Sequence, residues 1–101
     1  MKAIHLIERV NQVKKISETP SVWASGDWDI SEEAASALIG ADLYLHTAQD
    51  IPSHFGGLIL GYRVLSTSPV GRIVFLFSPT MDHKNVRAGR DGWGNEQKRV
   101  Q

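Results

Sequence analysis

Histidine, aromatic and basic side chains are the residues of this 101-residue chain that could do chemistry. His46, Asp50 and His54 follow one another at intervals of four, a spacing that on a helix would align a metal site. Pro52 and the apolar segments on either side argue against a helix, and zinc needs three or four converging ligands, so we expect no metal and no other cofactor. His46 could instead read a base edge or a carbonyl as a neutral imidazole, or be hydrogen-bonded within the fold.

The tryptophans Trp23, Trp28 and Trp93 stand among serine, glycine, aspartate and asparagine. Trp23 and Trp28 flank Ser25-Gly26-Asp27, which is typical of a turn, so we expect both rings in one loop. An indole beside polar groups can stack on a nucleobase, which contributes about 1–3 kcal/mol per base. Alternatively, each ring closes one end of the core.

Charge is unevenly distributed along a chain whose net charge is zero. The segment Asp27–Asp50 holds six acidic residues and no lysine or arginine. From Lys84 onward there are five basic residues and two acidic ones, and we expect Arg87 and Arg90 to bind phosphate. Alternatively, the two regions are solvated and pair with each other. Zero net charge argues against a strong nonspecific DNA-binding protein.

The composition predicts one domain, residues 1–101, with residues 85–101 as a loose basic tail. The chain has no cysteine, which excludes disulfides and thiolate chemistry and favours the cytoplasm. The start resembles no signal peptide, and no apolar run approaches the roughly 18 residues of a transmembrane helix, so we expect no membrane contact.

The apolar pattern predicts more strands than helices. Ser31, or alternatively Asp29, can cap a helix that ends before Gly40 and packs Leu38 and Ile39 on the core. Lys14–Glu18 is polar and extended or turning, and Asn85–Ala88 could add a short edge strand. The expected strands are Ala3–Ile7, Asp42–Thr47, Leu58–Leu65 and Arg72–Phe77.

The segment Leu58–Leu65 is the strongest strand, since its Leu-Ile-Leu run is apolar on both faces and suits a central position. We expect it to pair antiparallel with Arg72–Phe77. Gly61 within it indicates a bulge or a closely packed site, where valine would lower stability. The fold class is therefore mostly β with one or two short helices, a small antiparallel or mixed β-barrel.

Trp23, the helix ending at Gly40, and the segments DLYLHTA and PSHFGGLILGYRV together resemble the PUA-like superfamily, which includes the ASCH and EVE domains. In those domains a strand introduced by glycine ends in a polar or histidine-containing segment, and a loop and a second strand beginning at glycine follow. The resemblance spans Val22–Phe77 and implies a barrel that binds RNA or a modified base in a pocket between loops. The chain lacks the Lys-Thr followed by Glu and Arg of the hydrolytic ASCH type, so the resemblance implies binding rather than catalysis.

These observations favour a binding module for RNA, DNA or a modified nucleobase over an enzyme. One alternative is a phage-type or accessory interaction protein that presents Asp27–Asp50 to a basic protein partner. Another is a nucleoside hydrolase with His46 or Glu33 as general base. We expect Trp23 and Trp28 to share one pocket with His46 and the basic tail. The expected ligand-binding residues are Trp23, Ser25, Trp28, His46, His54, Arg87, Arg90 and Trp93.

Overall fold

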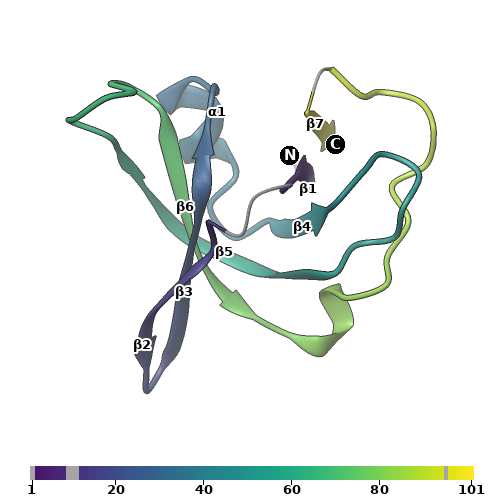
Figure 1. Ribbon diagram of the computed structural model, residues 1–101, viewed down its shortest axis with the longest axis horizontal. Coiled ribbons are helices and arrows are strands. Elements are labelled where there is room, and N and C mark those ends of the chain that lie inside the picture. Colours follow the sequence, from purple (N-terminus) through teal and green to yellow (C-terminus); the bar gives the residue numbers. More distant parts are fainter. Residues whose placement is uncertain (1, 9–11, 95) are drawn as a thin grey trace.

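The computed structural model describes residues 2–8, 12–94 and 96–101, which form one curled, mixed β-sheet and a short helix (Figure 1). In sheet order the strands run β2-β3-β6-β5-β4-β1-β7. The pairing of β1 with β4 is parallel and the other pairings are antiparallel. The elements are β1 (Ala3–Ile7), β2 (Lys14–Glu18), β3 (Ser21–Trp28), α1 (Glu32–Ala37), β4 (Asp42–His46), β5 (Phe55–Val64), β6 (Ile73–Pro79), the 3₁₀ turn η1 (Met81–His83) and β7 (Gln97–Val100).

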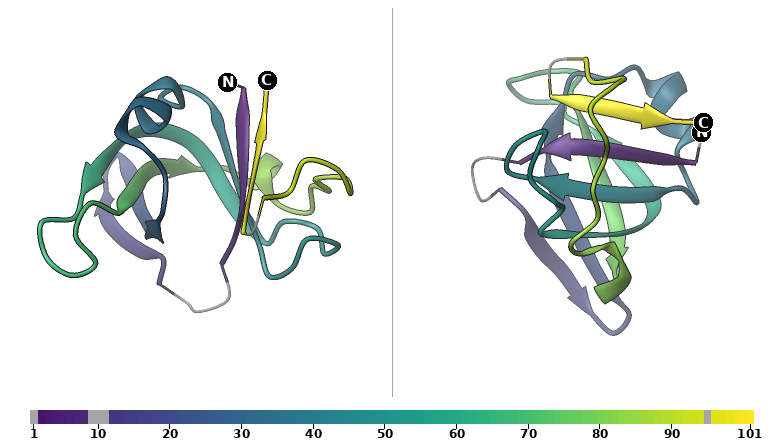
Figure 2. Two further views of the ribbon diagram at one scale, coloured as in Figure 1. Left: turned by 90° about the horizontal axis from the view of Figure 1, so that it is seen from above. Right: turned by 90° about the vertical axis from the view of Figure 1, so that its right-hand side faces the viewer.

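The expected fold class, mostly β with a short helix, is confirmed. The sheet curls around its core, but β2 and β7 remain its two edges, so it is not closed into a complete barrel. Figure 2 shows β1 and β7, at the two ends of the chain, side by side. Because β7 pairs with β1, the last residues belong to the sheet rather than to a loose tail. No helix in the described part of the chain is long and apolar enough to cross a membrane.

The core lies on the concave side of the sheet, and α1 covers one of its ends (Figure 1). Ser31 caps α1 as expected, because its Oγ accepts a hydrogen bond of 3.1 Å from the Ala34 amide. Leu38 is fully buried as expected, but Ile39 is 49% exposed, so the prediction that Ile39 packs on the core is wrong. The helix ends before Ile39, which leaves that side chain directed to solvent.

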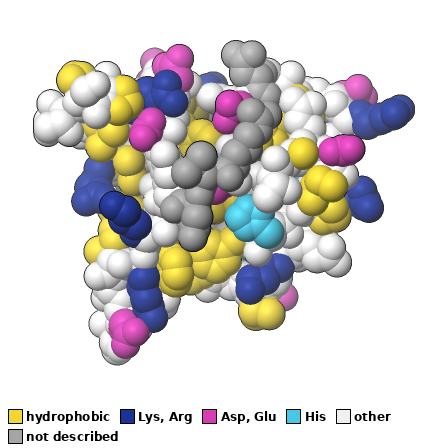
Figure 3. All heavy atoms as spheres, in the orientation of Figure 1, with side chains coloured by type: hydrophobic (Ala, Val, Ile, Leu, Met, Phe, Trp, Pro, Cys, Tyr) yellow, Lys and Arg dark blue, Asp and Glu magenta, His cyan; other side chains and the backbone are white. Residues whose placement is uncertain are grey.

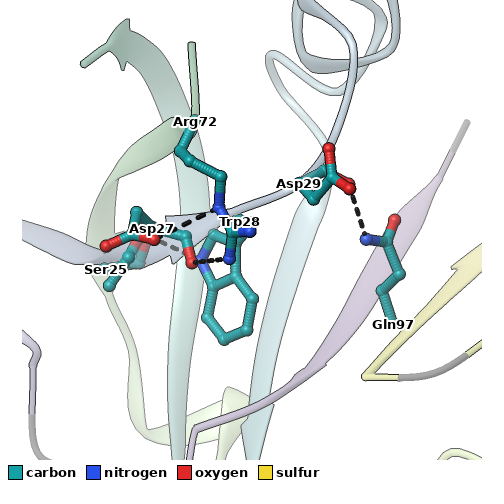
Figure 4. A network of polar contacts seen from close by, with 7 residues as sticks. Ser25, Asp27, Trp28, Asp29, Arg72 and Gln97 are labelled. Carbon is teal, nitrogen blue, oxygen red and sulfur yellow. Dashed lines mark hydrogen bonds and ion pairs between the residues drawn. The ribbon is translucent and has the colours of Figure 1, made fainter. Parts of the chain in front are cut away.

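The prediction of a loop around Ser25-Gly26-Asp27 is wrong, because this segment lies within strand β3. Its turn residues form a β-bulge, seen as a register shift against β6 between Ala24 and Asp27. At the bulge Ser25 Oγ accepts hydrogen bonds from the Phe75 amide (3.0 Å) and from the Trp28 indole (3.1 Å; Figure 4). A buried polar residue is thereby satisfied inside the sheet, and Trp28 becomes a core residue.

Strand β5 occupies a central position and pairs with β6 as expected. Its Leu-Ile-Leu run is not buried on both sides, because Leu58 and Leu60 are 41% and 46% exposed on the outer face. The core covers only the inner face, which holds Ile59. Gly61 lies at the expected bulge, where the register shifts after Ile59. The alternative of a closely packed site is wrong, because no heavy atom lies within 4 Å of the position that a Cβ would take. Residues 85–88 form a loop, so the edge strand considered there is absent.

Candidate functional site

A layer of aromatic and imidazole rings lies on the outer face of β1 and β4, opposite the core. We call His5, Tyr44, His46, His83 and Trp93 the ring layer. His5 and Tyr44 are register partners across the parallel pair, and their rings stack with centroids 4.6 Å apart. Tyr44 also contacts the ring of His83 at 5.1 Å, and Trp93 meets the ring of His46 edge-on at 5.8 Å.

His46 and His5 share a hydrogen bond whose direction follows from their surroundings. His46 Nδ1 lies 2.8 Å from the carbonyl oxygen of Ile51, which can only accept, so Nδ1 carries the proton. His46 Nε2 is then the acceptor for His5 Nδ1, 2.8 Å away. Burial lowers the pKa of His46, and burial, His46 and Lys98 together lower the pKa of His5 to about 4. Both rings are therefore neutral near pH 7.

Two loops, residues 47–54 and 84–94, pass over the ring layer and are joined by Ser53. Its amide donates to the carbonyl of Val86 (2.8 Å), and its own carbonyl accepts from the Asn85 amide (2.6 Å). Its hydroxyl donates to the carbonyl of His83 (2.7 Å) and accepts from the Val86 amide (2.9 Å). Ser53 is 4% exposed, so these buried hydrogen bonds fix the position of one loop against the other.

A cleft of about 580 Å³ opens between these loops, a size typical of small-ligand sites. We call it the arginine cleft, because Arg87 and Arg90, both predicted from the sequence to bind phosphate, line it together. On the opposite wall only Asp50 carried a signal in the sequence, through its spacing from two histidines, while Gln49 and Ile51 carried none. The lining residues are Gln49, Asp50, Ile51, Arg87, Ala88, Gly89 and Arg90.

His46, His54 and Trp93 lie near the cleft but do not line it. His46 is fully buried, and Trp93 donates from its indole nitrogen to the carbonyl of Gly89 at 3.1 Å. His54 is exposed, and partial burial and the nearby His46 lower its pKa. Trp93 therefore supports a cleft-lining residue instead of stacking on a ligand within the cleft.

Trp23, Ser25 and Trp28 do not share a pocket with His46, which corrects the expectation of one combined site. They lie on β3, which β6 and β5 separate from β4 in the sheet. Trp28 is 7% exposed, and the half-buried Trp23 packs edge-on against Phe55 at 5.1 Å. These rings belong to the core and its edge.

Two acidic side chains of the segment 27–50 bind partners from other parts of the chain. Asp27 pairs with Arg72 at 3.2 Å (Figure 4), and Asp42 accepts from His83 Nε2 at 2.9 Å. On the face drawn in Figure 3, acidic and basic side chains are interspersed. Within the described ranges, no three histidine, aspartate or glutamate side chains converge as a metal site would require.

Comparisons of the chain with protein-family models, with curated proteins and with solved structures give no match in any of the three. The arginine cleft is therefore the feature of the molecule that indicates a function. Two guanidinium groups can bind phosphate oxygens through paired hydrogen bonds, and an amide and a carboxylate on the facing wall can read donors and acceptors.

Proposed function

We propose that the arginine cleft binds a phosphate-bearing ligand of the nucleic-acid class, either a short stretch of RNA or DNA or a nucleotide with a modified base. The observation that carries the proposal is the presence of Arg87 and Arg90 on one wall of a single cleft. Planar guanidinium groups match phosphate geometry and also stack on bases, which makes paired arginines well suited to such ligands.

The facing wall supplies the other contacts that a nucleotide needs. The amide of Gln49 can pair with an adenine edge, and the carboxylate of Asp50 can accept from an exocyclic amino group. Ile51 adds an apolar surface for the flat side of a base. Asp50 also repels a phosphate placed close to it, so the phosphate is expected on the arginine side and the base on the other. The resemblance to PUA-like domains, which bind RNA or modified bases between loops, agrees with this proposal.

The two alternative functions receive less support from the geometry. A hydrolase that uses His46 as general base would need a free ring nitrogen, but His5 and Ile51 occupy both nitrogens. An acidic docking surface for a basic protein would lose the charge of Asp27, which pairs with Arg72, and basic side chains are interspersed with acidic ones on the face drawn in Figure 3. We therefore propose nucleic-acid binding ahead of either.

Substituting Arg87 or Arg90 by alanine is expected to weaken binding of a fluorescein-labelled 12-nucleotide RNA or DNA about tenfold, because a charge-assisted hydrogen bond to phosphate can no longer form. The slope of log affinity against log salt concentration is negative, and its magnitude should decrease by about 0.7 for each phosphate of a single strand that the variant no longer neutralises. Fluorescence anisotropy titrations between low and moderate salt measure both quantities.

Arg63→Ala is the matched control, because this exposed arginine on β5 does not line the cleft. It should change affinity and salt slope little. If Arg63→Ala and Arg90→Ala have equal effects, binding is diffuse and the cleft is not the site. If RNA, DNA and nucleotides all fail to bind the unaltered protein, the proposal is wrong and the interaction-protein alternative takes its place.

A further inference from the structure

Three side chains beneath the arginine cleft donate hydrogen bonds to the main-chain carbonyls of residues that line it. His46 binds the carbonyl of Ile51 in one wall. In the other wall, Lys98 Nζ donates to the carbonyl of Ala88 and the Trp93 indole donates to the carbonyl of Gly89. Each wall is thus held by at least one side-chain donor that belongs to the ring layer or lies beside it.

Lys98 comes from β7 and extends under the loop that carries both arginines. It is the register partner of His5, and its side chain is half-buried. A methyl group added at Gly89 would lie 3.3 Å from Lys98 Nζ, and one added at Gly92 would lie 3.4 Å from its Cε. The lysine stem therefore runs directly against the turns of this loop, where both glycines have left-handed φ angles of +85° and +90°.

Lys98 differs from Arg87 and Arg90 because its ammonium group binds a main-chain carbonyl. A lysine that binds phosphate in the cleft would extend into it, but Lys98 does not line the cleft. Its ammonium group instead fixes the carbonyl next to Arg87 and two positions before Arg90. A loop held in its binding conformation loses less entropy when the ligand arrives, which raises affinity without a direct contact.

We propose that Lys98 and Trp93 are positioning residues that preform the arginine wall of the cleft for its phosphate-bearing ligand, while His46 fixes the facing wall. This inference rests on the proposed function of the cleft. It assigns to the C-terminal strand, through Lys98, a role in ligand affinity that is separate from phosphate binding.

The test compares Lys98→Met, which keeps the aliphatic stem but removes the donor, with Lys98→Arg, which keeps a charged donor. In the free protein, hydrogen exchange of the amides of Asn85, Val86 and Gly94, whose hydrogen bonds bracket the loop, should accelerate about tenfold in Lys98→Met and return toward the original rate in Lys98→Arg. Affinity for the labelled 12-nucleotide strand should fall about fivefold in Lys98→Met, with an unchanged salt slope, and recover in Lys98→Arg.

Two results would overturn the inference: an unchanged exchange rate in Lys98→Met, or a salt slope reduced by about 0.7, which would mean that Lys98 binds phosphate directly. If the unaltered protein binds no nucleic acid, the proposed function fails, and the exchange rates alone still decide whether Lys98 holds the loop. Trp93→Phe is the second variant, which keeps a ring against His46 but loses the donor to Gly89, and serves if Lys98→Met fails to fold. It should also accelerate exchange at the amides of Asn85, Val86 and Gly94, and an unchanged rate there would count against the inference.

Discussion

Gly57→Ala is expected to lower the free energy of unfolding by more than about 4 kcal/mol. A loss of this size leaves most small domains largely unfolded. An added Cβ would lie 2.6 Å from the carbonyl carbon of Ser78 and 2.7 Å from Pro79 Cα, and would overlap the Ser78 oxygen. These are main-chain atoms of the neighbouring strand, so no side-chain rotation relieves the clash. Strand β5 is also held by β4 on its other side, where Gly57 pairs with Leu43. Urea unfolding followed by circular dichroism measures the loss.

Gly61→Ala is the matched control on the same strand. No heavy atom lies within 4 Å of the position its Cβ would take, and its φ is not left-handed. The variant should lie within about 1 kcal/mol of the original protein, because the site has room and alanine also restricts the unfolded chain. If Gly57→Ala unfolds at the same urea concentration as Gly61→Ala, β5 and β6 can separate at this point and the steric argument is wrong.

The contrast between these glycines illustrates what the sequence could predict. The bulge at Gly61 was predictable, because glycine between strand-forming residues is a local signal. The steric requirement at Gly57 was not, because it arises from the backbone of Ser78, which only the β5–β6 pairing brings close. In the same way Ser25-Gly26-Asp27 has the composition of a turn, and a partner fifty residues away, Phe75, makes it a bulge.

The candidate site was likewise only partly predictable from the sequence. Arg87 and Arg90 were predictable because they stand three residues apart in a basic segment. The ring layer was not predicted, because it depends on the parallel pairing of β1 with β4, which sets His5 beside Tyr44. One signal was available in the sequence: His5 alternates with Ile4 and Leu6, so a polar ring must face away from the core on a strand otherwise made of apolar residues. Such a residue needs a second covering layer or solvent, and here it has the layer.

Acidification from pH 7 to pH 4 is expected to lower the free energy of unfolding by about 3 kcal/mol through His5 alone. The pKa of His5 falls from its usual 6.5 to about 4 in the folded protein, through burial and the neighbouring His46 and Lys98. Each unit between the two pKa values corresponds to about 1.4 kcal/mol. Between these pH values the unfolded chain binds a proton that folded His5 does not, so stability is present above pH 6.5 and is lost as pH falls toward 4. Urea unfolding at a series of pH values measures the slope.

His5→Phe isolates this contribution, because phenylalanine keeps a ring over Tyr44 but cannot titrate. Burial also lowers the pKa of His46 and His54, which act with the same sign as His5, while burial raises the pKa of Glu8, which acts with the opposite sign. These three groups remain in both proteins, so the difference between the two pH profiles reports His5 and its coupling to His46. The unaltered protein should lose stability more steeply than His5→Phe between pH 6.5 and pH 4. Parallel profiles would mean that His5 accepts its proton in the folded state as readily as in the unfolded chain. Such a result would be compatible with the hydrogen bond from His5 Nδ1 to His46 Nε2, because a charged His5 can still donate it, whereas a second proton on His46 Nε2 would break it.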